Sequence, residues 1–484
     1  MRDVYDIIIV GSGVAGLYAA INASADMQVL IISKGSLELS NSALAQGGVA
    51  SVLNHKLDNF KIHIQDTLVA GGFTNNVEAV NVLVKEGPDE VLNLVKLGVD
   101  FDRDEHGTIH LTLEGGHTRN RIAHHKDTTG FEIISKLIAK IKSCNNIDIL
   151  DESALLRLEK TQNGFCAGII KDNNLINIAT KFCILATGGI GRVYENTTNS
   201  KIATGDGIYF AEKLGAKIKD ISLIQFHPTA FAVKQKGQEL FLISESVRGE
   251  GAVLLNCQGR RFMFDYDERG ELAPRDVVSK FILKEAEKTG SNDFFLDITS
   301  KSPEYVRTRF PAIYEKCLEF GIDITKDKIP VFPCQHYLMG GIDVDTFART
   351  TVEGLYAVGE CSHTGVHGNN RLASNSLLEA LVFSHRAVDD IASKVDTNYI
   401  PEKRKFTLKM GDVVPHNIIK EVNSIMQKSF FVKPNFEEVK RNIPRLQEIM
   451  QHLDSGDFAE NIETIEAKSI TKIAGLILQE VQQK

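Results

Sequence analysis

Short, wholly apolar runs near the start of the chain predict strands that are buried on both faces. Asp6 is followed by Ile-Ile-Ile-Val, and residues 29–32 read Val-Leu-Ile-Ile. Continuous apolar runs of this length are typical of parallel strands that helices cover on each side of a sheet. Residues 14–25, between the two runs, are rich in alanine and compatible with a helix. We therefore predict a βαβ unit over residues 4–33.

Longer segments with apolar residues every three or four positions predict helices. Residues 78–97 have this spacing, and Gly98 follows as the residue expected to end that helix. Residues 131–142 are also predicted to be helical, whereas residues 147–185 alternate in the manner of short strands. The last of these strands leads into Thr187-Gly188-Gly189, a second tight turn at a strand end. This first part of the chain therefore has the alternation of strands and helices that α/β folds show.

The pattern changes at about residue 225. Residues 225–339 contain turns punctuated by Gly and Pro and mixed short elements without a βαβ rhythm, which predicts an inserted domain. The first pattern resumes at residue 340, with a strand over 354–358 and a helix over about 376–392. After Lys403 three apolar stripes lie on charged, helical segments, which indicates a small helical bundle.

These patterns define a fold class and three domains. A chain of 484 residues exceeds what one hydrophobic core usually holds. The predicted class is α/β, with a Rossmann-like dinucleotide-binding domain that is interrupted by an α+β domain and followed by a helical bundle. The predicted limits are 1–224 with 340–395 for the first domain, 225–339 for the inserted domain and 400–484 for the helical domain.

Composition narrows the function classes. Lys and Arg total 55 against 63 Asp and Glu, and this net charge of −8 disfavours nucleic-acid binding, which usually needs a basic surface. Residues 1–5 lead into the first strand without a secretory leader, and no apolar run approaches the roughly 20 residues of a membrane span. Seven widely spaced cysteines form no pair typical of metal or redox sites. We expect reduced thiols, a cytoplasmic protein and no metal site.

A glycine turn follows the first strand. Gly11, Gly13 and Gly16 form a GxGxxG motif between a buried strand and a helix, the context in which this motif binds a dinucleotide. The glycines allow close approach of a pyrophosphate, and the helix N-terminus offers free N–H groups to it. The usual acid at the end of the second strand is absent, since Ser33 stands there with Lys34 next. A nucleotide-free α/β turn is the less favoured alternative.

Four side chains after residue 225 are suited to a small dicarboxylate. They are His227, Arg275, His336 and Arg371. Arg offers bidentate geometry to a carboxylate. A single Arg or His is more often part of a surface ion pair or a core hydrogen bond, but Arg275 and Arg371 are each flanked by small or turn residues. That setting favours a binding site.

Several motifs, in a fixed order, resemble a known family. They are Ala45-Gln46-Gly47-Gly48, Ala186-Thr187-Gly188-Gly189, Gly205-Asp206-Gly207, Gln225-Phe226-His227-Pro228-Thr229, Arg248-Gly249-Glu250-Gly251, Leu272-Ala273-Pro274-Arg275-Asp276, His336-Tyr337 with Gly340-Gly341, and Asn370-Arg371-Leu372-Ala373-Ser374-Asn375-Ser376. With them, residues 1 to about 395 resemble the succinate dehydrogenase/fumarate reductase flavoprotein superfamily. The helical tail after residue 400 is similar to that superfamily's C-terminal domain only in its general helical class.

The resemblance implies FAD and a capping domain, here 225–339, that closes over the flavin. A helix N-terminus after Ser374 would place a partial positive charge at the flavin pyrimidine edge, and an ordinary Ser N-cap is compatible with the same residues. The implied cofactor residues are Gly11, Ser12, Gly13, Ala15, Gly16, Ser33, Lys34, Asn41, Ser42, Ala45, Gln46, Gly47, Gly48, Ala154, Ala186, Thr187, Gly188, Asp206, Glu360, Arg371, Ser374, Asn375, Ser376 and Leu377.

The resemblance also assigns roles around the substrate. Arg275 would transfer a proton beside the reacting carbon, and Glu245 and Arg248 would lie on its proton route. The residues implied for the substrate carboxylates and their surroundings are Gln225, His227, Ser244, His336 and Arg371. Many relatives have Thr at the Ser244 position, so the hydroxyl is kept.

Two departures from the superfamily pattern indicate to which branch of the superfamily the chain is similar. Membrane-linked members carry a His that is joined covalently to FAD, and Asn41 occupies that position here. They also have an aromatic residue where this chain has Glu114, and an acid there fits a substrate with an ammonium group. Without the resemblance, Glu114 would be interpreted as a solvated loop charge. Together the departures favour the branch that oxidises L-aspartate.

That branch implies a reaction and partners. L-aspartate would be oxidised to iminoaspartate, with oxygen or fumarate as electron acceptor, in the first step of NAD biosynthesis. Quinolinate synthase would be the functional partner that uses the product. The alternatives are a soluble fumarate reductase, or a succinate dehydrogenase flavoprotein subunit that docks to an iron–sulfur protein. A flavin-binding scaffold without activity is disfavoured because the polar substrate residues are all retained.

We predict that FAD is bound without a covalent link, because the Asn41 amide lacks the nucleophilic imidazole nitrogen that such a link requires. Precipitation of the purified protein with acid should release the yellow colour into the supernatant. Colour that stays in the washed pellet would contradict this.

Overall fold

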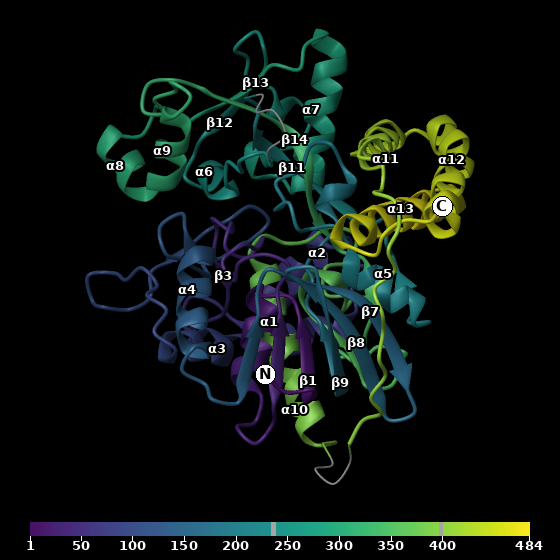
Figure 1. Cartoon of the computed structure of the whole chain (residues 1–484). Coiled ribbons are helices and arrows are strands. Elements are labelled where there is room, and N and C mark those ends of the chain that lie inside the picture. Colours follow the sequence, from purple (N-terminus) through teal and green to yellow (C-terminus); the bar gives the residue numbers. More distant parts are fainter. Residues whose placement is uncertain (234–238, 396–399) are drawn as a thin grey trace.

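The fold has a lower α/β part, an upper part that stands on it, and a helical part at the side (Figure 1). This computed structural model describes residues 1–233, 239–395 and 400–484. The N-terminus lies in the lower part and the C-terminus in the helical part (Figure 1). This arrangement has the predicted α/β class.

A seven-stranded sheet is the centre of the lower part. The strands β1, β2, β6, β9 and β16 pair in parallel, whereas β7 and β8 form an antiparallel extension on β9. The predicted βαβ unit is confirmed, although its helix α1 (Val14–Asn22) ends three residues early. The strand bounds are β1 (Val4–Val10), β2 (Val29–Ile32), β6 (Ile147–Leu150), β7 (Ser153–Thr161), β8 (Gly164–Lys171), β9 (Asn174–Leu185) and β16 (Leu355–Ala357).

The continuous apolar run in β1 is buried on both faces, as its sequence predicts. Ile7 and Ile9 belong to a core shared with α1, α3, α4 and α10, and Ile8 and Val10 belong to a second core on the opposite face. The covering helices are α3 (Val77–Lys96), α4 (Thr129–Ile141) and α10 (Asn375–Ala392). Helix α3 ends at the cap residue Leu97, and Gly98 follows with a positive φ of 94°.

The upper part has its own sheet and core. Its antiparallel strands have the order β11-β14-β13-β12, and its core consists of residues between Phe231 and Val331. We propose residues 225 and 339 as the limits of this domain. The bounds are β11 (Ile224–Phe231), β12 (Val253–Leu255), β13 (Phe294–Asp297), β14 (Ile329–Leu338), α6 (Glu245–Gly249), α7 (Arg275–Thr289), α8 (Pro303–Arg309) and α9 (Pro311–Leu318).

The helical part consists of α11 (Asn417–Ser429), α12 (Phe436–Ser455) and α13 (Ile462–Gln483), which match the three predicted apolar stripes. Its apolar residues join the core on the Ile8 face of the central sheet. The expectation of helix directly after Lys403 was wrong, because residues 400–416 contain no helix. Gly411 and Pro415 disfavour one there, and the backbone N–H of Phe406 instead donates to Asn177 Oδ1 on β9 at 2.8 Å.

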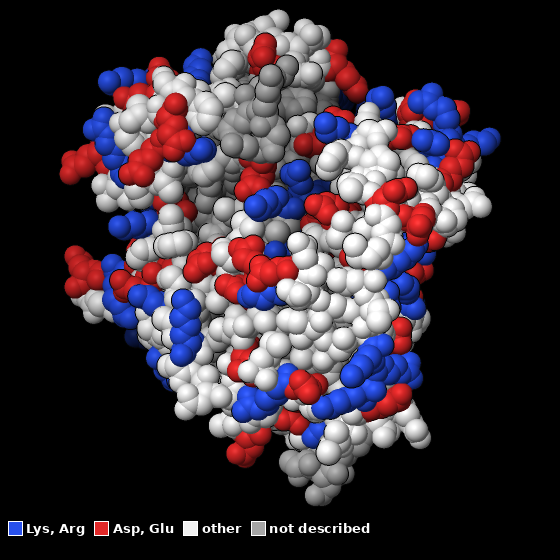
Figure 2. Space-filling model, viewed as in Figure 1, with Lys and Arg blue, Asp and Glu red and all other residues white. Residues whose placement is uncertain are grey.

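Shorter elements complete the described chain. They are α2 (Phe60–Ala70), α5 (Asp206–Lys213), the strands β3 (Val49–Ala50), β4 (Leu111–Thr112), β5 (Ile122–Ala123), β10 (Ile218–Lys219), β15 (Gly341–Asp343), β17 (Ser362–His363), β18 (Phe430–Phe431) and β19 (Lys433–Pro434), and the 3₁₀ turns η1 (Gly191–Val193), η2 (Met263–Asp265), η3 (Gly270–Leu272) and η4 (Gly359–Cys361). Over the described ranges, no helix is both long and apolar enough to cross a membrane. Lys and Arg are interspersed with Asp and Glu on the face in Figure 2.

Helix α9 of the upper part is capped by a side chain of the lower part. The carboxylate of Asp127 accepts hydrogen bonds from the backbone N–H groups of Ala312 at 3.3 Å and Ile313 at 2.9 Å. Next to it, Arg309 Nη1 donates to the carbonyl oxygen of Lys126 at 2.7 Å. The first N–H groups of a helix have no partner within the helix, so Asp127 satisfies them from another domain.

We predict that Asp127→Ala weakens this contact by about 1 kcal/mol, the usual effect of removing an N-cap. Backbone amides of Ala312 and Ile313 should then exchange hydrogen faster, as followed by mass spectrometry. Asp127→Asn is the matched control, because its amide oxygen can still accept. Unchanged exchange in Asp127→Ala would contradict the role of Asp127 as a cap.

Candidate active site

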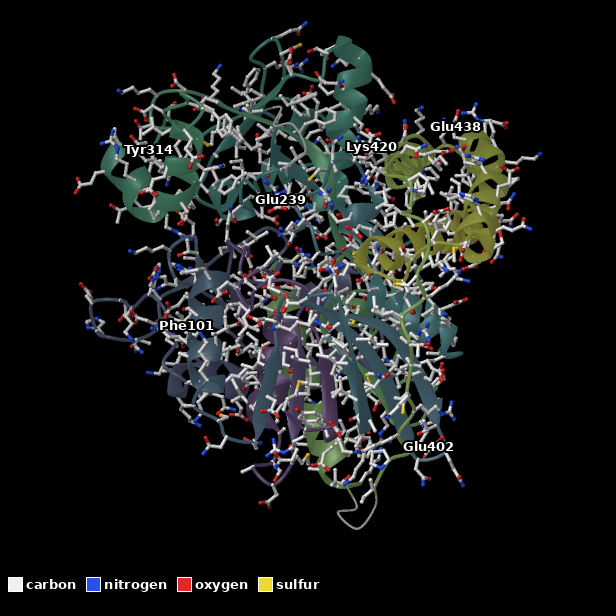
Figure 3. The ribbon with its side chains drawn as sticks, viewed as in Figure 1. Phe101, Glu239, Tyr314, Glu402, Lys420 and Glu438 are labelled. Carbon is white, nitrogen blue, oxygen red and sulfur yellow. The ribbon has the colours of Figure 1, made fainter. Side chains whose placement is uncertain are left out.

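A cavity of about 680 Å³ lies between the lower and upper parts. The lower part contributes the glycine turn after β1, the loop 39–48, the turn after β9 and the start of α10. The upper part contributes residues such as Glu245, Arg275 and His336. Glu239 also lines the cavity, and Figure 3 shows it where the upper part faces the lower part. The cavity therefore collects residues from segments far apart in the sequence.

Close packing of the backbone requires glycine at two positions of the turn after β1. Gly11 has a φ of 120°, and a Cβ there would lie 2.1 Å from the carbonyl oxygen of Ala186. A Cβ on Gly16 would lie 2.0 Å from the Gly11 oxygen. The ends of β1 and β9 and the start of α1 can therefore meet only without these side chains. Gly16 serves this packing and does not line the cavity, whereas Gly11 and Gly13 do.

The wall near this turn fits a dinucleotide such as FAD. Helix α1 begins after Gly13, and its first N–H group, that of Val14, donates to the Ser42 hydroxyl at 3.1 Å. Among the described residues no side chain accepts from the N–H groups of Ala15 and Gly16, which leaves them for phosphate oxygens. The hydroxyl of Thr187 on the wall is buried and has no hydrogen-bond partner among the described residues. A Cβ at the adjacent Gly188 would meet nothing within 4 Å, so open space lies beside the backbone there.

Four of the predicted cofactor residues, Ser12, Ser33, Lys34 and Asp206, form a polar corner at the wall. Ser12 and Ser33 share a hydrogen bond of 2.7 Å between their hydroxyls. Lys34 Nζ lies 2.8 Å from Asp206 Oδ2 and 2.7 Å from Glu466 Oε1 on α13. Among these five residues, only Ser12 lines the cavity. The Lys34 ammonium is occupied by protein oxygens, so its proposed contribution to the cofactor site is to hold Asp206 in place.

The start of α10 is held in a strained conformation. Ser374 has a φ of 59°, a conformation that costs a non-glycine residue about 1–3 kcal/mol. Its hydroxyl is not an ordinary N-cap: it donates to Glu114 Oε2 at 2.5 Å and accepts from the Gly48 N–H at 3.2 Å. Ser374, Ser376 and Leu377 line the cavity. Asn375 points away from it, toward His63 and Thr67.

Asn41 lines the cavity, as predicted, and its amide is engaged by the protein. Its Oδ1 accepts from the backbone N–H of Ser200 at 2.8 Å. Nearby, Glu360 Oε1 accepts from the Leu338 N–H at 3.0 Å. Burial raises the pKa of Glu360 to about 7, against the opposing effects of this N–H and of Arg371. Glu360 is therefore a half-buried carboxyl that can serve as donor or acceptor to a ligand near neutral pH.

Two arginines of the site share one amide. Gln225 Oε1 accepts from Arg275 Nη1 at 3.0 Å and from Arg371 Nη2 at 3.2 Å. Arg371 also donates to the hydroxyl of Ser376 and lies 4.0 Å from the ring centroid of Tyr337. Burial, followed by the charge of Arg275, lowers the pKa of Arg371 to about 10. Gln225 itself does not line the cavity, so it orients both guanidinium groups from behind.

The three residues predicted for proton transfer form one chain. Arg275 Nε donates to Glu245 Oε2 at 2.5 Å, and Arg248 Nη2 lies 3.3 Å from Glu245 Oε1. Burial raises the pKa of Glu245, but Arg275 and Arg248 outweigh it and hold the pKa below its usual range. Arg275 and Glu245 line the cavity, whereas Arg248 lies behind them, fully buried. The arrangement connects the cavity with the interior of the upper part.

Two neutral histidines lie beside the arginines. The ring centroids of His227 and His336 are 4.9 Å apart. Burial and the charge of Arg275 lower the pKa of both imidazoles well below the usual range. His227 Nδ1 accepts from the Thr229 N–H at 3.2 Å, so Nε2 carries the proton, and this buried donor has no partner among the described residues. Only His336 reaches the cavity wall.

Glu114 is buried, with 3% of its surface exposed, so it is not a solvated loop charge. Burial raises the pKa of its carboxyl, Glu245 adds to this, and the bond from Ser374 and the charge of Arg275 oppose it. Glu114 lines the same cavity as Arg275 and Arg371. An acid in this position is ionised more easily when a cation lies beside it.

The structure brings most of the predicted site residues to the cavity. Those on its wall are Gly11, Ser12, Gly13, Ala15, Asn41, Ser42, Ala45, Gln46, Gly47, Gly48, Glu114, Ala186, Thr187, Gly188, Ser244, Glu245, Arg275, His336, Glu360, Arg371, Ser374, Ser376 and Leu377. Those behind it are Gly16, Ser33, Lys34, Ala154, Asp206, Gln225, His227, Arg248 and Asn375. Ala154 is part of β7 and packs in a hydrophobic core.

Sequence reasoning did not single out several residues of the wall. Thr198 shares a hydrogen bond of 2.7 Å with His336 Nδ1, and the Tyr337 ring faces Arg371. Lys316 extends from α9, and Glu239 and Phe241 belong to the upper part. Tyr337 lies inside a motif that the sequence shows, but an isolated Thr, Lys or Phe carries no signal of its position in a cavity.

A dinucleotide turn, a helix N-terminus at the far end of the cavity and a cluster of buried cations define an FAD-dependent oxidoreductase. The chain matches the FAD binding domain family over residues 6–377. It is 50% identical over 398 residues to an L-aspartate oxidase of Clostridium perfringens, which covers 82% of this chain and 88% of that protein. It is 42% identical over 426 residues to an L-aspartate oxidase of Clostridium acetobutylicum, 88% of this chain and 96% of that one.

The fold agrees with this likeness. A solved structure of an E. coli quinol fumarate reductase with a point mutation superimposes with a TM-score of 0.89 and 28% identity, covering 99% of this chain and 89% of that chain. The chain therefore belongs to the L-aspartate oxidase family, within the succinate dehydrogenase/fumarate reductase flavoprotein superfamily. It is an enzyme, and FAD is its cofactor.

We predict that Arg275→Met retains FAD and the fold but loses about 10²–10⁴-fold in turnover, the usual contribution of a general acid or base. Methionine fills similar space but cannot carry a proton between Glu245 and the cavity. FAD content, circular dichroism and steady-state turnover should be measured on one preparation. A loss below tenfold at normal FAD content would remove Arg275 from proton transfer.

Proposed function

We propose that the protein oxidises L-aspartate to iminoaspartate. The observation that carries this proposal is the buried carboxyl of Glu114 in the same cavity as the guanidinium groups of Arg275 and Arg371. The charges of the two cations balance those of the two carboxylates of a four-carbon diacid, and the acid suits an ammonium group. L-aspartate carries all three charged groups.

FAD supplies the chemistry of this reaction by accepting two electrons from the amino-bearing carbon. The residues proposed to hold it are those of the glycine turn, the loop 41–48, Thr187, Glu360 and the start of α10. The free N–H groups at the start of α10 would face developing negative charge, since a helix N-terminus carries a partial positive charge. These residues bind and orient the cofactor, whereas the upper part supplies the groups that meet the substrate.

The proposed binding mode divides the carboxylates between two sets of donors. Arg371 and His336, with His227 Nε2 behind them, would hold one carboxylate, and Ser244 would donate to the other. Because both imidazoles are neutral, they act as hydrogen-bond donors without adding charge. Arg275 would then lie beside the reacting carbon and pass a proton toward Glu245 and Arg248, the chain of contacts described above.

The electron acceptor and the fate of the product are also part of the proposal. Oxygen and fumarate are both proposed acceptors, since fumarate presents two carboxylates to the same cations. We further propose quinolinate synthase as the functional partner that uses iminoaspartate in NAD biosynthesis, and the cytoplasm as the compartment. The seven cysteines are all free thiols, which is compatible with a reducing compartment.

Anaerobic mixing of the oxidised protein with L-aspartate, and separately with succinate, tests the substrate directly. Loss of the flavin absorbance with L-aspartate and not with succinate is expected. Bleaching by succinate alone would favour the alternative, a succinate dehydrogenase or fumarate reductase activity. Bleaching by neither would overturn the proposed function.

We predict that Glu114→Gln lowers kcat/KM for L-aspartate oxidation by roughly 10–100-fold, because a hydrogen bond to a charged group contributes about 1.5–3 kcal/mol. Fumarate reduction with a reduced dye should fall much less, since fumarate has no ammonium group. Glutamine is the matched replacement because its amide oxygen can still accept from Ser374. Both activities can be assayed on one preparation.

The pH profile provides an internal check on Glu114. Its pKa is raised, and only the ionised form pairs with an ammonium group, so L-aspartate activity should fall as the pH drops through that pKa. This acid-side fall should be absent from Glu114→Gln. Equal losses of both activities in the variant would instead indicate a structural role.

A further inference from the structure

The buried residues of helix α2 are all polar, and its half-buried apolar residues Phe60, Ile64 and Leu68 pack against a neighbouring core. Its buried residues are His63, Asp66 and Thr67, with the i, i+3 and i+4 spacing of a single helix face. Asp58, just before the helix, is buried as well. Replacing buried polar and ionic groups by apolar ones is often neutral or stabilising, so such a face is weak evidence for stability. Its contacts point instead to a role in positioning.

The face of α2 is connected to the loop that carries Glu114. Arg121 is fully buried and donates from Nε and Nη2 to the two carboxylate oxygens of Asp58, at 2.8 and 2.9 Å. Its Nη1 donates to Asp66 Oδ2 at 2.6 Å and lies 3.0 Å from His117 Nδ1. Both ends of the loop segment 114–121 are therefore fixed, by Ser374 at Glu114 and by α2 at Arg121.

The contact with Arg121 determines which nitrogen of His117 carries the proton. A guanidinium group can only donate, so His117 Nδ1 must accept. Nε2 then carries the proton and donates to the carbonyl oxygen of Ala373 at 2.9 Å. Burial and the charge of Arg121 lower the pKa of His117 to about 3, so the ring stays neutral and this tautomer is kept at ordinary pH.

Helix α2 also holds the residues that follow Ala373. Asn375 Nδ2 donates to Thr67 Oγ1 at 3.0 Å, so its Oδ1 accepts from His63 Nε2 at 2.9 Å. Between them, the carbonyl oxygen of Ser374 accepts from the Ala50 N–H at 3.0 Å. The backbone from Ala373 to Asn375, with Ser374 at a positive φ, is thus fixed at each residue. Strain of this kind persists only where the surroundings fix the conformation.

We propose that His117 and His63, with Arg121 and helix α2 behind them, are positioning residues of the active site. They hold the turn 373–375 so that the first N–H groups of α10 face the flavin and Ser374 holds Glu114 toward the substrate. The inference rests on the proposed function for Glu114, but its effect on the flavin does not depend on the substrate. Apart from the backbone N–H of His117, which donates to the carbonyl oxygen of Glu114 at 3.2 Å, the described hydrogen bonds of His117 and His63 reach the cavity wall through this turn. A side-chain substitution leaves that backbone bond in place.

A pair of substitutions at His117 separates positioning from simple packing. In His117→Gln the side-chain amide nitrogen takes the place of Nε2 and can still donate to Ala373. In His117→Asn the shorter side chain can accept from Arg121 but cannot reach Ala373. Both variants remove the imidazole, so a purely structural role would affect them alike.

The measurement is the midpoint potential of the bound flavin, by photoreduction against a reference dye without any substrate. We expect a shift to more negative potential in His117→Asn, because the reduced, anionic flavin loses part of the positive helix end that stabilises it. His117→Gln should stay near the wild-type potential. Equal shifts in the two variants, or no shift in either, would overturn the proposal whatever substrate the enzyme uses.

The pair His63→Gln and His63→Asn repeats the test at Asn375 and decides the question if His117→Asn does not fold. The glutamine again retains a donor at the Nε2 position, and the asparagine does not. Thermal unfolding of each variant should be recorded beside the potential. A potential that follows the loss of stability, rather than the loss of the donor, would also contradict positioning.

Discussion

The site depends on burying three guanidinium groups with too few anions to neutralise them. Arg248, Arg275 and Arg371 are all buried, and Glu245 is shared by the first two, while Gln225 offers Arg275 and Arg371 only a neutral oxygen. Removing charges from water is costly unless partners compensate them. Burial lowers the pKa of Arg371 and of Arg248, and the charge of Arg275 adds to this effect. A dianionic ligand would supply the negative charge that these buried arginines lack.

Burial, followed by the charge of the neighbouring arginines, keeps the adjacent imidazoles neutral. His227 and His336 cannot gain a proton beside these cations, so they remain hydrogen-bond donors and acceptors. Arg371 is steadied by the face of the Tyr337 ring, which adds attraction without a full charge. Selectivity for an aminated diacid would therefore have to come from another residue, and the proposed one, Glu114, belongs to the lower part of the molecule.

Glu114 and the start of α10, which is proposed to face the flavin, share one support. Ser374 contacts both, and its strained backbone is fixed by residues of α2 and of the loop 114–121. A change in this support would alter the substrate side and the cofactor side together. The upper part supplies Arg275 and His336, and the lower part is proposed to hold FAD. The lower part would also contact the substrate, because Glu114, the proposed partner of the ammonium group, belongs to it.

The sequence by itself determined the elements with strong local patterns. The apolar runs of β1 and β2, the GxGxxG turn and the three stripes of the helical bundle require only neighbours along the chain, and each was located correctly. The family motifs also brought Glu114, Arg275 and Arg371 to attention. Local patterns failed where distant contacts compete with them, as in residues 400–416, where side chains of β8 and β9 hold the backbone.

Tertiary structure decided which residues face the cavity and which support it. Gln225, His227 and Asn375 lie inside motifs, yet they stand behind the wall, because a motif gives residue types and not the direction of side chains. The positions of His63, Asp66 and Arg121 were not predictable either. A polar helix face such as that of α2 is expected to face solvent, and only the fold, by placing Arg121 and Asn375 against it, makes it a buried support.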